Sequence, residues 1–152
     1  MSGLINKFGA GFYFALAAAA LALVSLIIYG INAASQYYND INTQIITMTS
    51  FAIIFCAAAA ILPQFNFAQN NIVKIATDIL FVIAAVLLIW SVMIFIGDRV
   101  ESLAYVFGSD LESDNMAAQS GTRQAVAGFV IYFIAWLFAV IGTFNCIVKK
   151  NA

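Results

Sequence analysis

Four long runs of apolar residues, separated by short polar stretches, dominate this chain of 152 residues. A helix that crosses the hydrocarbon core of a bilayer needs about 20 mostly apolar residues, and each run is close to that length. Runs this long and this rich in alanine and leucine do not fit strands. The sequence therefore predicts an all-α integral membrane protein, a compact antiparallel bundle of four transmembrane helices forming a single domain over 1–152. The helices are expected at about 11–32, 45–62, 72–97 and 124–148.

The composition excludes a soluble enzyme. Hydrophobic residues make up 64% of the chain and charged residues 9%, whereas soluble domains average about 45–50% and about 25%. A soluble fold of this size could not bury so much apolar surface. We therefore expect the lipid bilayer to surround most of the chain.

Several kinds of site are excluded by what the sequence lacks. There is no histidine, which rules out histidine-ligated haem, histidine-containing zinc sites and histidine acid–base chemistry. Cys56 and Cys146 do not form a C-x-x-C motif. The net charge is −1 and the longest basic run is Lys149-Lys150, so nucleic acid is not an expected partner. We predict no catalytic residue, no cofactor and no metal ligand.

The distribution of basic residues predicts the orientation in the membrane. With four spans, both termini share one side with the segment 63–71. That side holds four basic residues and the other side two, and in short loops the side richer in Lys and Arg is cytoplasmic. We therefore predict a multi-pass protein of the cell (plasma) membrane with both termini in the cytoplasm. The basic residues are Lys7, Lys74, Lys149 and Lys150 on the predicted inner side, and Arg99 and Arg123 on the outer side.

The joints between the spans carry helix-ending and helix-starting residues. Pro63 is expected to end the second span, because proline lacks the N–H that a helix interior needs. The stretch Asn39-Asp40-Ile41-Asn42-Thr43 offers N-cap candidates for the second span, and Ser120-Gly121-Thr122 offers them for the fourth.

The segment 98–123 is predicted to be an extracytoplasmic loop with a short amphipathic helix. Its apolar residues Val100, Leu103, Ala104 and Phe107 have the spacing i, i+3, i+4, i+7 of one helical face. This helix either prolongs the third span or lies on the membrane surface. Two interpretations stay open for the segment, a solvated connection and a docking surface. The candidate docking residues are Arg99, Glu101, Tyr105 and Phe107.

Asp78 is the one acidic residue within a predicted span. It lies six residues after Ile72, about 9 Å along the helix. Acids inside a membrane are costly and tend to face a partner or a cavity. Lys74 is four residues earlier on the same helical face, so a paired, purely structural acid is one interpretation. A proton- or cation-linked site between helices is the other.

Small residues predict that the helices pack closely on one another. In the fourth span Gly128, Ala135 and Gly142 recur at intervals of seven, a spacing that lets helix backbones approach in lipid. The sequence leaves open whether the neighbouring helix belongs to this chain or to another. Trp90 and Trp136 lie well inside their spans, where packing in the bundle core is favoured over the wall of an apolar ligand pocket.

The chain resembles a group of small four-span membrane proteins of Gram-positive bacteria. The likeness covers most of the chain and rests on Lys7-Phe8-Gly9-Ala10-Gly11-Phe12, Arg99-Val100, Asn115-Met116-Ala117 and the Lys149-Lys150 tail. It implies the four-span architecture and no activity. A further likeness, to eukaryotic MARVEL-type proteins, rests on Asp78 and Arg123 and implies that both termini are inside. Those proteins have a basic residue in the first span, which this chain lacks.

Taken together, the sequence favours a small non-enzymatic membrane protein, an accessory or scaffold subunit of a membrane complex. Its expected partner is another membrane protein or a second copy of itself. The alternative is a small oligomeric transporter or channel that uses Asp78 and Lys74. A membrane enzyme is least favoured, because no nucleophile–base pair or cluster of acids is gathered at one interface.

Overall fold

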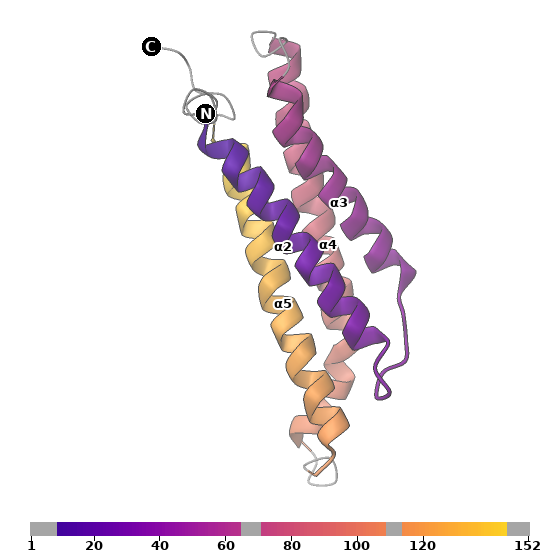
Figure 1. The fold of residues 1–152 in the computed structure, drawn as a ribbon. Helices are drawn as coiled ribbons and strands as arrows, with labels where there is room; N and C mark the ends of the chain where they lie inside the picture. Colours follow the sequence, from indigo (N-terminus) through magenta and orange to yellow (C-terminus); the bar gives the residue numbers. More distant parts are fainter. Residues whose placement is uncertain (1–8, 65–70, 109–113, 146–152) are drawn as a thin grey trace, which may run out of the picture.

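The computed structural model describes residues 9–64, 71–108 and 114–145, and within these ranges it contains helices and no strand (Figure 1). All four long helices have the length and the hydropathy needed to cross a membrane. The prediction of an all-α, multi-pass membrane bundle is therefore confirmed. The elements are α2 (Ala10–Ala33), α3 (Thr43–Ile61), the 3-10 turn η1 (Leu62–Gln64), α4 (Asn71–Gly108) and α5 (Met116–Thr143).

The helices run alternately in opposite directions, and each packs against two neighbours (Figure 1). Helices that follow one another in the chain are in contact, and the packing of α2 against α5 closes the bundle. This is the up-and-down arrangement that short connections produce. One end of the bundle holds the connection 34–42 and the start of α5, and we call it the Arg99 end. The opposite end holds η1, and we call it the Pro63 end.

Small residues and aromatic rings share the core of the bundle. The buried residues of α2 and α3 include many alanines, while α4 and α5 contribute large rings such as Phe81, Phe95 and Tyr132. Gly128, Ala135 and Gly142 are all buried within this chain. A Cβ added to Gly142 would lie 2.7 Å from Cε1 of Phe81. The small face of α5 therefore receives rings from α4.

The helix ends follow from identifiable residues. α3 ends at Ile61 and passes into η1, which contains Pro63, as predicted. Asn42 caps α3, its Oδ1 accepting the backbone N–H of Gln44 at 3.0 Å. The predicted cap of the fourth helix at Ser120-Gly121-Thr122 is wrong. α5 begins at Met116, and Oδ1 of Asn115 accepts backbone N–H groups of its first turn at 3.1 and 3.2 Å.

The predicted loop 98–123 is mostly helical. α4 continues without a break through Gly108, so the amphipathic turns prolong the third span, which was one of the two expected alternatives. No proline interrupts the helical period after Asp98, and the capped first turn of α5 extends the next helix backwards. Only residues 109–115 separate the two helices.

α4 is longer than a membrane is thick. Its 38 residues span about 57 Å at 1.5 Å per residue. Asp78 and Asp98 bracket the stretch 79–97, which contains no charged residue. These two acids are 20 residues apart, about 30 Å, which matches the hydrocarbon core of a bilayer. α4 is therefore about 27 Å longer than the hydrocarbon core, and the uncharged stretch 79–97 is the part of it that suits lipid tails best.

Candidate functional site

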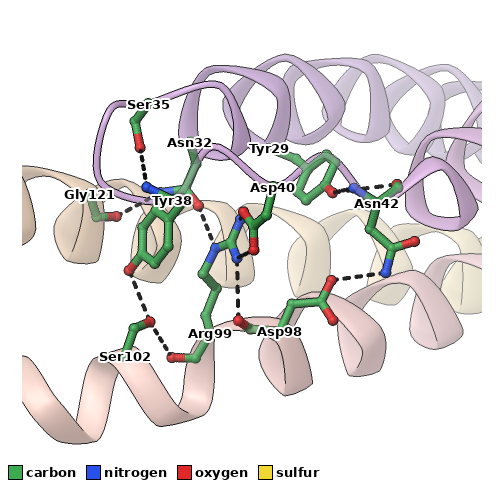
Figure 2. Close-up of polar contacts among 10 residues, drawn as sticks. All are labelled: Tyr29, Asn32, Ser35, Tyr38, Asp40, Asn42, Asp98, Arg99, Ser102 and Gly121. Atoms are coloured by element: carbon green, nitrogen blue, oxygen red, sulfur yellow. Dashed lines mark hydrogen bonds and ion pairs between the residues drawn. The ribbon is translucent and has the colours of Figure 1, made fainter.

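The most elaborate polar cluster lies at the Arg99 end, where the connection 34–42 crosses the bundle (Figure 2). Arg99 on α4 is 0% exposed. Its Nη1 and Nη2 donate to the two carboxylate oxygens of Asp40 at 2.8 Å each. Nε donates to Oδ1 of Asn32 at 2.9 Å. This bidentate, charge-assisted pairing is the strongest geometry available to an arginine and a carboxylate.

Asn32 and Tyr38 extend the cluster to α5. Nδ2 of Asn32 donates to the carbonyl oxygen of Gly121 at 2.7 Å, so one amide joins α2, α4 and α5. The ring of Tyr38 covers the guanidinium of Arg99, with Cζ 4.0 Å from the ring centroid, a cation–π contact. A Cβ on Gly121 would lie 2.9 Å from Cε2 of Tyr38, which explains the glycine at this position.

The backbone of the connection holds Asp40 against Arg99. Asn39 adopts a left-handed conformation with φ 43°, which asparagine tolerates better than most residues. The N–H of Asn39 donates to the carbonyl of Ser35 at 2.9 Å, and the N–H of Asp40 donates to that of Ala33 at 3.0 Å. These bonds fold the connection back over the end of α2.

Asn42 links three helices beside the Arg99 pair. Its backbone N–H donates to the hydroxyl of Tyr29 on α2 at 2.7 Å. Its Nδ2 donates to Oδ2 of Asp98 on α4 at 3.0 Å, while its Oδ1 caps α3. Figure 2 shows this group adjoining the Arg99–Asp40 pair.

Replacing Asn42 tests how much the cap contributes. Asn42→Ala removes the cap and the bond to Asp98, and we expect it to lower the free energy of unfolding by about 1 kcal/mol. Asn42→Ser keeps a capping oxygen, so we expect a loss under about 0.5 kcal/mol. Thermal unfolding of both variants in one detergent measures the difference. Equal losses would show that the cap contributes nothing.

The arrangement of the cluster is that of a structural lock. The guanidinium of Arg99 is enclosed by Asn32, Asp40 and the ring of Tyr38, so it does not face an anion from outside. The side chain of Asp40 keeps 52% of its surface exposed. The cluster therefore closes one end of the bundle with a single ion pair, of which only the acid touches the surroundings.

Arg99 was a candidate docking residue, but its side chain is buried and cannot contact a partner. Its position four residues after Phe95 places it on the buried face of α4, and Asp40, 59 residues earlier, neutralises it. The buried stripe of Leu88, Val92 and Phe95 leads to Arg99 at helical spacing, and this was the signal in the sequence that could have found it. The other docking candidates, Glu101, Tyr105 and Phe107, are exposed.

Asp78 and Lys74 do not form an interior site. Both are exposed on the outside of the bundle. The ion pair found in the described ranges is Arg99–Asp40, and none joins Lys74 to Asp78. Asp78 lies directly before the uncharged stretch 79–97, in the second turn after the start of α4 at Asn71. The ion pair expected between Lys74 and Asp78 is therefore not found.

The two tryptophans also differ from expectation. Trp90 is exposed on the outer face of α4, so the prediction that it packs in the core is wrong. Trp136 is partly buried and packs against the core. It also lines an apolar surface groove of about 260 Å³ between α4 and α5. Position along a span does not fix the face on which a side chain lies, which explains the difference.

Outside the Arg99 cluster, the described residues form no second cluster of acidic or thiol side chains. In the part of the chain that the structure describes, no three Cys, Asp or Glu side chains come close enough to hold a metal ion. Cys56 is a buried free thiol on α3, and Cys146 lies outside the described residues. A shallow depression of about 420 Å³ on α5 near the Arg99 end is lined by Met116, Gln119, Ser120, Arg123 and Gln124.

Comparisons of the chain with protein families, with curated proteins and with solved structures found no match. The resemblance to small four-span bacterial proteins therefore stays a prediction from the sequence. The geometry of the chain itself is what supports a function.

Proposed function

We propose that the chain is a small non-enzymatic accessory or scaffold subunit of a membrane complex. The observation that carries this proposal is that two large apolar side chains are exposed outside the uncharged stretch 79–97, one on α4 beyond Asp98 and one at the start of α5. Tyr105 is 61% exposed and Met116 84%. Burying one such side chain in a contact with a partner stabilises the complex by roughly 1.5–3 kcal/mol.

The hydrogen bonding of polar groups in the bundle interior favours a scaffold function over a channel or transporter. The hydroxyls of Thr49 and Tyr132 bond to each other at 2.9 Å in the core. Ser25 and Ser91 donate to carbonyls of their own helices at 2.8 and 2.9 Å. Because these buried polar groups bond within the protein, they do not form a hydrated line through the bundle.

The alternative function is an oligomeric transporter or channel that uses Asp78 and Lys74. Since both side chains lie on the outside of the bundle, such a pathway would have to run between copies or between this chain and a partner. We therefore place the accessory function first. The proposed setting is the cell membrane with both termini in the cytoplasm, supported by the count of basic residues on the two sides.

Pull-down of the tagged chain from its native membrane in mild detergent tests the proposal. We expect a second membrane protein to be recovered in a constant ratio to the chain. The double variant Tyr105→Ser/Met116→Ser should reduce that recovery at least tenfold. The matched control Leu16→Ala/Leu23→Ala, at exposed apolar positions of α2, should leave it unchanged.

Two results would contradict the accessory function. One is recovery of the chain without any other membrane protein. The other is a partner that the Tyr105→Ser/Met116→Ser variant retains in full, since the exposed apolar end would then not be the binding surface.

A further inference from the structure

The outer face of α4 carries an uninterrupted seam of apolar and small residues. From Ile79 through Ile83 and Val86 onward, successive seam residues are four and three positions apart in turn. This is the spacing of the contact positions in a coiled coil. Every one of them is exposed in the single chain. The opposite face of α4 packs in the bundle, so this helix has two apolar faces. The last six positions of the seam are Trp90, Met93, Gly97, Val100, Ala104 and Phe107.

The seam extends beyond the part of α4 that lipid can cover. Its stretch up to Gly97 lies within the uncharged, membrane-length segment, where exposed apolar side chains are ordinary. Val100, Ala104 and Phe107 follow Asp98 and lie about 3 to 14 Å beyond it along the helix. Val100 is 56% exposed and Phe107 77%. Lipid tails do not account for apolar residues there, but a helix that continues alongside α4 does.

We infer that a second copy of this chain packs along this seam, forming a parallel dimer through α4. The occupant has to follow α4 through the bilayer and continue about 14 Å past it. In the described ranges, α4 itself is the longest helix, with 38 residues. Two copies inserted in the same direction bring their α4 helices together in parallel and at equal height. A two-fold axis along the membrane normal then pairs each seam residue with its own counterpart.

Charge and size along the seam suit self-association. None of the seam positions from Ile79 to Phe107 is charged. Glu101 lies at the edge of the seam, where a parallel pairing sets it opposite Ile96 of the second copy and not opposite another acid. A Cβ added to Gly97 would meet nothing within 4 Å in this chain. This glycine therefore serves no packing within one copy, and it allows the backbones of two copies to approach.

This dimer is independent of the accessory function proposed above. It uses the outer face of α4, whereas the exposed pair Tyr105 and Met116 lies off the seam. The two proposals can therefore fail separately.

Cysteine cross-linking in native membranes tests the dimer. In a chain with Cys56→Ala and Cys146→Ala, the variants Val100→Cys and Phe107→Cys place a thiol opposite its own counterpart. We expect each to form a disulfide-linked dimer on mild oxidation, at least tenfold more than Ile31→Cys. Ile31 is the matched control, because it is 56% exposed like Val100 and lies at the same end of the bundle, on α2, which packs against α3 and α5.

A charge swap tests the equal-height pairing. Val100→Glu and Val100→Lys, each expressed alone, set like charges opposite each other and should reduce cross-linking through Phe107→Cys at least tenfold. Expressing the two together should restore it, because Glu then faces Lys. Val100 is exposed, so thermal unfolding should show that both variants keep the fold.

The proposal is overturned if Val100→Cys and Ile31→Cys cross-link equally, or if neither forms a dimer. A cross-link of Val100→Cys to a different protein would also overturn it. Cross-linked dimers combined with an empty pull-down would keep this inference and remove the accessory function. A recovered partner without cross-linked dimers would do the reverse.

Discussion

Asp40→Ala is expected to lower the free energy of unfolding by about 3 kcal/mol. The substitution leaves the guanidinium of Arg99, which is 0% exposed, without its counter-ion. Breaking a buried pair by removing one partner costs about 3–5 kcal/mol, and the lower end applies because half of the Asp40 side chain is exposed. Thermal or denaturant unfolding in one detergent measures the loss.

Two controls separate the ion pair from a general effect of charge. Asp98→Ala removes a nearby exposed acid that bonds only to the amide of Asn42 through its side chain, and we expect a loss under about 1 kcal/mol. In the double variant Asp40→Ala/Arg99→Met the buried charge is gone, so its loss should be less than the sum of the two single losses. If Asp40→Ala and Asp98→Ala lowered the free energy of unfolding equally, the Arg99–Asp40 ion pair would have no special part in stability.

The second large effect is expected at Gly128 on α5. A Cβ there would lie 2.8 Å from Cε1 of Phe95 and 3.3 Å from Cγ2 of Ile28. Phe95 is buried, and its ring centroid is 4.9 Å from that of Tyr29 and 4.7 Å from that of Phe129, so it has little room to move. Gly128→Leu should therefore cost about 3 kcal/mol, the upper end of the overpacking range.

Gly30 on α2 provides the matched control. A Cβ at Gly30 would meet nothing within 4 Å, so Gly30→Leu should be neutral, or stabilise α2 by up to about 1 kcal/mol through helix propensity. Both variants are compared by thermal unfolding in the same detergent. If Gly128→Leu and Gly30→Leu lowered the free energy of unfolding by similar amounts, the contact with Phe95 would not be what makes Gly128 sensitive to a larger side chain.

The four spans could be predicted from the sequence because they depend on local features. The length of each apolar run, the proline at Pro63 and the capping residue Asn42 act over a few positions of the chain. The extension of α4 past Asp98 was predicted only as one alternative, since an amphipathic turn suits both a longer helix and a helix on the membrane surface. The structure decides between them.

The polar cluster could not be predicted in the same way. Its partners are far apart in the sequence, and a charge just after an apolar run ordinarily indicates an exposed loop residue. Arg99 differs because it lies on the face of α4 that faces the core. The ion pair expected between Lys74 and Asp78 was inferred from their spacing alone, and both side chains are exposed on the outside of the bundle.

The Arg99 cluster also sets an order for the assembly of the protein during synthesis. Asp40 is made 59 residues before Arg99, and Asn32 is made 89 residues before Gly121, whose carbonyl it binds. When α2 and α3 have been made, the carboxylate of Asp40 therefore still lacks its counter-ion. Its counter-ion Arg99 is made only near the C-terminal end of α4. The side-chain N–H of Asn32 finds its acceptor, the carbonyl of Gly121, only when α5 is made. Completion of this cluster therefore requires α4 and the start of α5, and a chain truncated before them would leave charged and polar groups unpaired at one end of its helices.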